Sequence, residues 1–197
     1  MMLKNFKVKR TERGVISDFI ETHHYSHSIN GCISDYCFAL YDEDDNMTGA
    51  MFYGRMAMHN QWKKFAEVAT DVIELRRLVC IDDTPKNTES YFIGATLRMM
   101  KKEWNPNGVV VSYADREYGH SGIIYKASNF KQTAITTGAK VIIFEGKRYH
   151  DKAIRTKYKG ELKPFAKRLK LALEEGRATY KITAGKITYI YKLGEHK

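Results

Sequence analysis

Apolar and polar positions recur along this chain with two periods, one of two residues and one close to 3.6. The shorter period predicts strands, and the longer one predicts helices with a single apolar face. We predict strands at Phe6–Arg10, Tyr36–Tyr41, Met47–Tyr53, Ile73–Ile81, Val109–Tyr113, Ile135–Thr137, Lys140–Phe144, Thr179–Ile182 and Lys186–Tyr191. We predict helices at Gly14–His23, Thr88–Trp104, Gly122–Ser128 and Leu162–Glu175, and the segment Met56–Asp71 is ambiguous, with one helical turn around Trp62–Val68.

Turn residues close several of these elements. The acidic DEDDN turn joins the second and third strands as a β-hairpin, and the NPNG turn at 105–108 ends the second helix. Ala184-Gly185 joins the last two strands as a terminal hairpin. In the last helix Phe165, Leu169 and Leu173 form the apolar face. The order of elements indicates an α/β fold with a mixed sheet flanked by helices, followed by a basic C-terminal helix and hairpin.

Length and composition fit one globular domain, which we expect to span residues 1–197, with a basic C-terminal part at 145–197 packed on it. Three cysteines, an odd number without CxxC spacing, argue against a disulfide framework and favour a reducing compartment. No apolar run approaches 18 residues. We therefore expect a soluble, cytoplasmic protein without a membrane partner.

The net charge of +10 is unevenly distributed. Residues 1–125 hold 15 Lys and Arg against 17 Asp and Glu, whereas residues 126–197 hold 18 against six. A basic half of this kind favours a polyanion partner, most often nucleic acid, although a solvated lysine-rich surface has the same composition. The candidates for phosphate contact are Lys147, Arg148, Lys152, Arg155, Lys157 and Lys159.

The stretch from Ile73 to Phe130 places polar residues where strands give way to loops, which is where open α/β sheets bind ligands. Arg76 and Arg77 are adjacent on a strand, so they face opposite sides. Glu74 lies on the same face as Arg76 and can pair with it, which leaves Arg77 to face a substrate. The alternative is that both arginines have structural partners.

The segment PKNTES at 85–90 lies where a strand leads into a helix, so backbone N–H groups are available to an anion. Asn87, Thr88 and Ser90 add side-chain donors, although ordinary N-capping needs only one of them. The sequence contains neither a P-loop nor a GxGxxG motif.

Other titratable residues are placed for chemistry. His24 beside Tyr25 can act as a base, a proton shuttle or a hydrogen-bond donor, or can serve only as a cationic helix end. Asp115 can act as a base or bind an exocyclic amine, or can cap a loop. Tyr125 can act as an acid or a stacking platform, or can pack in the core. His23 and His27 lack a third ligand, so spacing gives little support for a metal site, and the same holds for iron at His24 and Asp115.

The motifs RRLVCIDDTPKNTES, SYAD and GHSGIIYKASNF, with HYS at 24–26, resemble the Mom family of phage DNA-modification proteins. The resemblance implies a GNAT (N-acetyltransferase-like) fold. It also implies conversion of adenine N6 in DNA to a carbamoylmethyl (glycinamide) adduct that protects phage DNA from host restriction. The functional positions implied by the resemblance are His24, Tyr25, Arg77, Ser90, Asp115 and Tyr125.

The sequence leaves the donor of the transferred group open. GNAT enzymes carry a glycine-containing loop around the coenzyme A pyrophosphate, whereas the matching segment here reads PKNTESY and lacks those glycines. Glycyl-tRNA and an acyl-CoA such as acetyl-CoA are both candidate donors, so tRNA joins DNA as an expected partner. We expect the donor to be held by Arg77, Asn87, Thr88 and Ser90. The alternative functions are a conventional acetyl-CoA-dependent N-acetyltransferase of a protein or small amine, and a non-enzymatic DNA-binding module.

Overall fold

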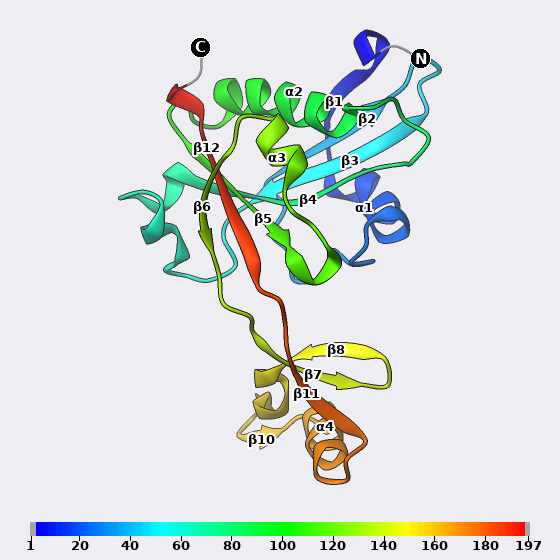
Figure 1. Cartoon of the computed structure of the whole chain (residues 1–197), viewed down its shortest axis with the longest axis vertical. Helices are drawn as coiled ribbons and strands as arrows, with labels where there is room; N and C mark the ends of the chain where they lie inside the picture. Colours follow the sequence, from blue (N-terminus) through cyan, green and yellow to red (C-terminus); the bar gives the residue numbers. More distant parts are fainter. Residues whose placement is uncertain (1–2, 196–197) are drawn as a thin grey trace. The chain divides into compact units, whose positions relative to one another are not determined.

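The computed structural model describes residues 3–195, which form two compact units (Figure 1). Unit 1 comprises the described part of Met1–Ala114, Ser121–Ala134 and the described part of Ile187–Lys197. Unit 2 comprises Asp115–His120 and Ile135–Lys186. The expected division at residue 145 stays a prediction.

A seven-stranded sheet in the order β1-β2-β3-β4-β5-β12-β6 forms the centre of unit 1. Neighbouring strands from β1 to β4 are antiparallel, and β4 and β5 are parallel. The strands are β1 (Lys7–Thr11), β2 (Tyr36–Tyr41), β3 (Met47–Gly54), β4 (Val72–Cys80), β5 (Val109–Asp115), β6 (Lys131–Ile135) and β12 (Lys186–Lys192). The helices of this unit are α1 (Arg13–His23), α2 (Thr88–Glu103) and α3 (Ile123–Ala127), and 3₁₀ turns lie at Leu3–Asn5, Gln61–Lys64, Ala69–Asp71 and Leu193–Glu195.

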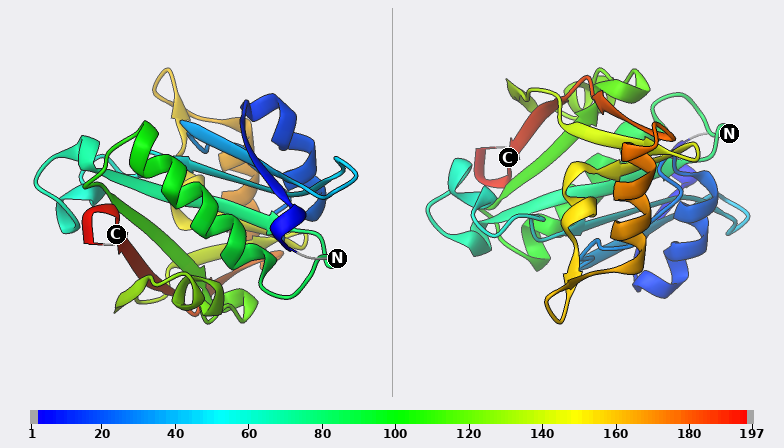
Figure 2. Two further views of the ribbon diagram at one scale, coloured as in Figure 1. Left: turned by 90° about the horizontal axis from the view of Figure 1, so that it is seen from above. Right: turned by 90° about the horizontal axis from the view of Figure 1, so that it is seen from below.

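Helices α1 and α2 cover opposite faces of this sheet (Figure 2). Successive residues of a strand point to opposite faces. Phe38 and Leu40 of β2 therefore pack in one cluster with α2, whereas Cys37 and Ala39 pack in another with Ile16 of α1. The layered α/β architecture predicted from the sequence is confirmed, and the predicted helix and strand bounds in unit 1 lie within about two residues of those observed, except for the strand predicted at Ile135–Thr137.

A β-bulge interrupts the pairing of β3 with β4. Phe52 lies opposite Arg77 and Tyr53 lies opposite Leu75, so Arg76 is the extra residue on β4. A bulge re-aims the side chains around it and is common beside functional sites. The orientation of Arg76 and Arg77 therefore follows from the bulge as well as from strand alternation.

The parallel pairing of β4 with β5 is short. It runs from Val72 opposite Val109 to Leu75 opposite Ser112, and each strand continues past this last pair. The carboxyl ends of the two strands are therefore not paired with each other. This is the position at which ligands bind in open α/β sheets.

Unit 2 has a core of its own. A three-stranded sheet in the order β11-β7-β8 packs on α4, with Ile142, Phe144 and Leu169 buried between them. Ala166 and Ala172 are the other buried residues of α4, whereas Phe165 is exposed, so the predicted apolar face was only partly right. The elements are β7 (Lys140–Phe144), β8 (Lys147–His150), a 3₁₀ turn η5 (Asp151–Arg155), β9 (Lys157–Tyr158), β10 (Glu161–Leu162), α4 (Pro164–Glu174) and β11 (Ala178–Ile182), after the 3₁₀ turn η4 (Arg116–Tyr118).

The terminal hairpin predicted around Ala184-Gly185 is wrong, because β11 pairs with β7 whereas β12 lies between β5 and β6. The chain instead continues straight, and residues 183–186 pair with 136–139. Thr136 N–H donates to Lys186 O at 2.8 Å, and Thr183 N–H donates to Ala139 O at 3.0 Å. The bounds of the strand predicted at Ile135–Thr137 are also wrong, because the observed strand β6 runs from Lys131 to Ile135. These long-range pairings leave no local signal in the sequence.

Candidate functional site

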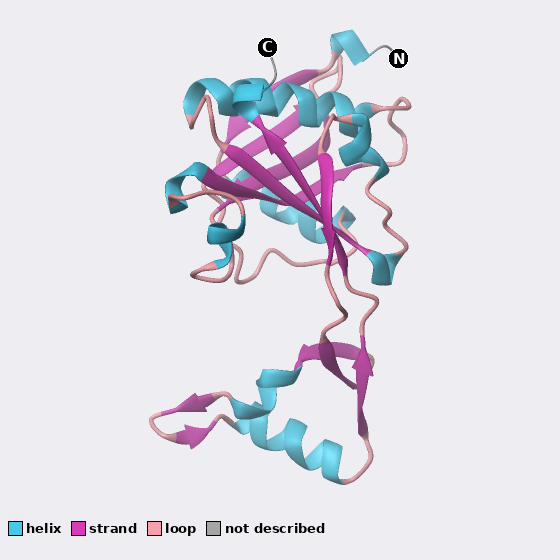
Figure 3. Cartoon of the chain, turned by 60° about the vertical axis from the view of Figure 1, so that its left-hand side comes forward, coloured by secondary structure: helices cyan, strands magenta, loops and turns pink. Residues whose placement is uncertain are grey.

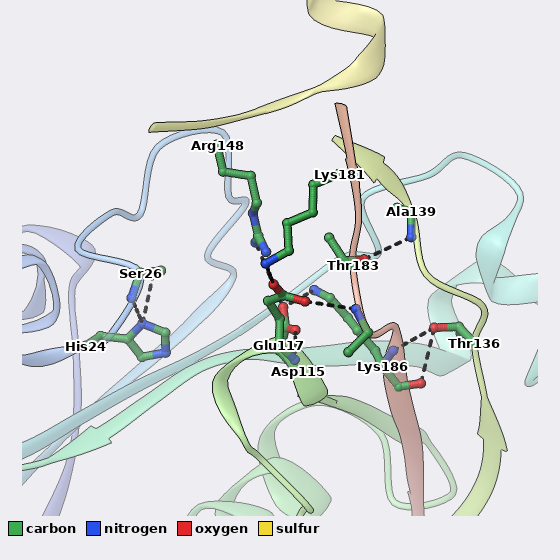
Figure 4. A network of polar contacts seen from close by, with 11 residues as sticks. His24, Ser26, Asp115, Glu117, Thr136, Ala139, Arg148, Lys181, Thr183 and Lys186 are labelled. Atoms are coloured by element: carbon green, nitrogen blue, oxygen red, sulfur yellow. Dashed lines mark hydrogen bonds and ion pairs between the residues drawn. The ribbon is translucent and has the colours of Figure 1, made fainter. Parts of the chain in front are cut away.

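His24 lies at the end of α1 with its imidazole buried (Figure 4). Its Nδ1 accepts a hydrogen bond from the Ser26 backbone N–H at 3.1 Å and lies 2.8 Å from Ser26 Oγ. Because a backbone N–H always donates, Nδ1 is the acceptor and a neutral ring carries its proton on Nε2. The loop after α1 thus sets His24 as a donor through Nε2.

Arg77 is joined to the same loop. Its Nε donates to the carbonyl oxygen of Ser28 at 3.2 Å, and Ser26 Oγ donates to that oxygen at 3.2 Å. Arg77 Nη1 donates to Arg76 O at 2.8 Å. The structure therefore brings His24 and Arg77 into one polar network through Ser26 and Ser28. No hydrogen bond of Arg77 Nη2 is found within residues 3–195, so this nitrogen can bind a ligand.

The predicted pairing of Arg76 with Glu74 is confirmed. Arg76 Nη1 lies 3.3 Å from Glu74 Oε2, and the two side chains are only 9% and 15% exposed. Arg76 Nη1 also donates to Arg55 O at 3.0 Å. A buried charge needs such partners. The bulged Arg76 is therefore structural, and the next residue, Arg77, carries the guanidinium that faces the loop after α1.

Tyr125 of α3 contacts Ser112, which forms with Leu75 the last residue pair between β4 and β5. Ser112 Oγ donates to Leu75 O at 3.3 Å, and Ser112 also hydrogen bonds with Tyr125. Burial raises the pKa of Tyr125 to about 12, with smaller upward contributions from Tyr25, Glu74 and Tyr189 and a downward one from Ser112. The phenol is therefore a stable hydrogen-bond donor at neutral pH. The ring of Tyr25 also lies beside His24, with the two ring centroids 4.2 Å apart.

Packing against β12 fixes the position of α3. Gly122 precedes the helix with a φ of 72°, and a Cβ atom there would lie 2.3 Å from the ring of Tyr189. Tyr189 Oη donates to Ser121 O at 2.7 Å, and its ring lies 5.3 Å from that of Tyr125. Tyr125 is thus packed against β12, and its role as an acid or a stacking platform stays a prediction.

The PKNTES segment forms the start of α2. Thr88 is fully buried and donates to Pro85 O at 2.6 Å, so its hydroxyl supports the loop. Ser90 Oγ donates to Asn87 O at 3.0 Å, and Asn87 has a φ of 74°. Within residues 3–195 no contact links Ser90 to the network of His24 and Arg77. The N–H groups of Glu89 and Ser90 have no hydrogen-bond partner among the described residues, as is usual in a first helical turn.

Asp115 ends β5 and belongs to unit 2, where its carboxylate is buried (Figure 4). It accepts the Glu117 N–H at 3.1 Å and pairs with Lys186 Nζ at 3.6 Å and Arg148 Nη2 at 4.0 Å. Glu117 in turn pairs with Lys181 and accepts a hydrogen bond from the Ala184 N–H. Asp115 is therefore held by a polar network within its own unit, and the contribution of Lys186 could not be inferred from the sequence.

The structure sorts the six basic candidates of unit 2. Arg148 pairs with Asp115, and Arg155 pairs with Asp151 at 3.1 Å. The other four are lysines without an acidic partner among residues 3–195, namely Lys147, Lys152, Lys157 and Lys159. In the described part of the chain, no three His, Cys, Asp or Glu side chains are grouped to hold a metal ion. None of its helices is long and apolar enough to span a membrane.

The sequence of residues 5–197 matches the model of the Mom protein family. The chain belongs to this family. The resemblance read from its motifs is confirmed. A curated relative is the methylcarbamoylase Mom of Escherichia phage Mu, 27% identical over 130 residues. The match covers 64% of this chain and 53% of the relative, so it spans about half of that protein's length.

Solved structures show the same fold. Spermidine N-acetyltransferase SpeG of Vibrio cholerae, in complex with CoA and spermine, is 9% identical, with a TM-score of 0.54 over 96% of each chain. The protein yncA of Salmonella typhimurium, whose structure holds acetyl-CoA, is 8% identical, with a TM-score of 0.55 over 98% of this chain and 96% of that one. The predicted GNAT-like fold is confirmed.

Proposed function

We propose that this chain is a DNA-modifying transferase that converts adenine N6 to its N6-carbamoylmethyl (glycinamide) derivative and so protects phage DNA from restriction. Membership of the Mom family supports a DNA substrate, because the curated relative is a methylcarbamoylase of a phage. The observation that carries the proposal is the network that joins His24 to Arg77 through Ser26 and Ser28. It links an imidazole donor to the guanidinium at the bulge of β4.

The proposed roles follow from what each group can donate or accept. Arg77 Nη2 binds the carbonyl oxygen of the donor and the negative charge that develops on it, which is usually a large electrostatic contribution to catalysis. Ser90, at the start of α2, holds another part of the donor. His24 Nε2–H donates a hydrogen bond to the oxygen of the leaving group. For Asp115, which lies in unit 2, the family resemblance implies acceptance of the adenine N6 proton or orientation of the amine. The base stacks on Tyr25, which is 39% exposed, or on Tyr125, whose hydroxyl already hydrogen bonds with Ser112.

The substrate amine sets a second requirement. Adenine N6 is stacked and paired in a duplex, so the enzyme must extrude the base or use an opened strand. The unpaired lysines of unit 2 contact phosphates and supply the binding energy for this step.

Glycyl-tRNA is the proposed donor. Adenine N6 attacks the glycyl carbonyl, the ester to tRNA breaks, and N6-glycyladenine forms with loss of one proton. The glycyl α-amine then attacks C6 through a five-membered ring, and the C6–N6 bond breaks. The former N6 becomes the carboxamide nitrogen of the glycinamide, so no atom is added or lost in the second step.

An acyl-CoA is the alternative donor. The solved structures named above hold CoA or acetyl-CoA on the same fold, and the N–H groups of Glu89 and Ser90 are available to an anion here. The segment before α2 nevertheless lacks the glycines that let a backbone approach a pyrophosphate closely. Direct transfer from acetyl-CoA gives N6-acetyladenine, a product distinct from the glycinamide by mass.

Mass spectrometry of nucleosides from cells that express the chain tests the function. The N6-carbamoylmethyl adduct is expected with the wild type and at the background level with Arg77→Ala. Reconstitution with purified DNA and either glycyl-tRNA or acetyl-CoA then identifies the donor. Acetylation of a protein or small amine without any DNA adduct would identify a conventional acetyltransferase. DNA binding without an adduct would identify a binding module.

A further inference from the structure

The strands β9 and β10 of unit 2 form a short hairpin with a tight tip. Tyr158 lies opposite Glu161 and Lys157 lies opposite Leu162, so only Lys159 and Gly160 form the loop. Both loop residues have positive φ, 49° and 85°, as a two-residue hairpin turn requires. The tip is therefore narrow, and it places Tyr158 and its neighbours at the end of a two-stranded ribbon.

Among residues 3–195 the hairpin tip has no packing partner that would explain its aromatic residue. Tyr158 is 65% exposed, and Lys157 and Lys159 on either side are exposed as well. Lys159 Nζ lies 5.6 Å from the centre of the Tyr158 ring. Figures 2 and 3 show the hairpin projecting beyond α4. An aromatic ring between two cations at a projecting tip has the composition of a nucleic-acid contact.

The base of the hairpin is anchored. The Lys163 N–H donates to Thr156 O at 2.9 Å, and Lys167 Nζ lies 3.7 Å from Glu161. The hairpin follows η5 and precedes α4, and both of these elements pack in the core of unit 2. These contacts hold the base of the hairpin against the core of unit 2, and the tip extends from it.

We propose that the β9–β10 hairpin enters the major groove of B-form DNA and that Tyr158 inserts between base pairs as a wedge that unstacks an adenine. The proposal rests on the proposed function. A two-stranded β-ribbon fits the major groove of B-DNA, and adenine N6 faces that groove. The deep, narrow major groove of A-form RNA does not admit such a ribbon, so the shape favours DNA. Lys157 and Lys159 contact the phosphates on either side.

Wedge side chains in other DNA-binding proteins partially unstack the step they enter. Unstacking is the step that the proposed reaction needs, because N6 is otherwise paired. The hairpin therefore accounts for an exposed tyrosine that the chemistry at His24 and Arg77 does not use.

The test measures base opening without catalysis. Full-length wild type and Tyr158→Ala are mixed with a duplex whose adenines are replaced by 2-aminopurine, which fluoresces when unstacked. Wild type raises the fluorescence, and Tyr158→Ala reduces this rise and weakens duplex binding about tenfold, the effect of one lost stacking contact. Tyr158→Trp retains both. Tyr180→Ala, which removes another exposed tyrosine beside a lysine in unit 2, is the matched control and leaves both unchanged.

A duplex with an unpaired adenine opposite an abasic site separates opening from simple contact. The affinity of Tyr158→Ala recovers there to within about threefold of wild type, because opening no longer costs energy. Equal 2-aminopurine fluorescence with wild type and Tyr158→Ala overturns the wedge while the adduct assay still tests the function. A Tyr158 dependence seen with tRNA and not with duplex DNA overturns it as well.

Discussion

The Nε atom of Arg77 lies 3.2 Å from the carbonyl oxygen of Ser28. This hydrogen bond connects the bulge of β4 to the loop that follows α1. The same oxygen accepts from Ser26 Oγ, which contacts His24 Nδ1. A guanidinium and an imidazole from distant parts of the sequence are thereby linked through Ser26 and one backbone carbonyl.

The Arg77→Lys variant tests this connection. Lysine keeps the positive charge but lacks Nε and the planar fork, so it cannot bind Ser28 O and present a second nitrogen to a ligand at once. We expect formation of the DNA adduct to fall about 100-fold, the size of effect typical of a lost oxyanion donor. The free energy of unfolding should change by about 1 kcal/mol, measured by urea denaturation.

Arg55→Lys is the matched control. Arg55 is exposed and pairs with Asp35 at 3.5 Å on the surface, where such pairs contribute little. Its adduct level and its unfolding midpoint should equal those of the wild type. Full activity of Arg77→Lys would remove Arg77 from the proposed mechanism.

Tyr125 makes a prediction about high pH. Burial raises its pKa to about 12, above the ordinary value near 10. The folded state therefore holds the proton more tightly than the unfolded state, so this contribution to stability is complete below pH 10 and is lost as the pH rises toward 12. The phenol stays protonated, and able to donate, throughout the neutral range.

Spectrophotometric titration of tyrosinate absorbance measures this directly. The wild type should show ionisation steps near pH 12 from both Tyr125 and Tyr113, whose pKa burial also raises to about 12. Tyr125→Phe should lose one step and Tyr113→Phe the other. Ionisation of Tyr125 near pH 10 would mean that its hydroxyl is not buried against Ser112.

The sequence was sufficient where the signals are local. Strand alternation predicted the pairing of Arg76 with Glu74, and the strand-to-helix junctions located the polar groups. It failed where contacts join distant segments. The role of Ser28 belongs to its backbone carbonyl, which every residue has, and the partner of Asp115 at Lys186 lies 71 positions further along the chain. The bulge at Arg76 depends on the register of β4 with β3, and no residue pattern in β4 alone predicts it.

The lysines of unit 2 make a prediction about salt. Each phosphate contact steepens the dependence of log K on log salt by about 0.9 in B-DNA. Lys147→Ala, Lys152→Ala, Lys157→Ala and Lys159→Ala should each reduce the slope by about this amount. Arg148→Ala and Arg155→Ala should reduce it less, because these side chains already pair with Asp115 and Asp151. Fluorescence anisotropy with duplex DNA over a salt series measures the slopes, and equal effects for all six would show that these ion pairs open on binding.

The close contact between residues 136–139 and 183–186 of unit 2 predicts the effect of a substitution at Gly185. Gly185 has a φ of 78°, and a Cβ atom there would lie 2.2 Å from Thr136 O, where residues 136–139 run beside 183–186. Gly185→Ala should lower the free energy of unfolding by more than about 2 kcal/mol, because it adds a clash with the backbone to left-handed strain of about 1 kcal/mol. Gly176→Ala is the control, since its φ of 73° is similar but no atom lies within 4 Å of the added Cβ. Only the strain should appear there. Equal losses in urea denaturation would mean that the segments do not run together, and would restore the local hairpin at Ala184-Gly185.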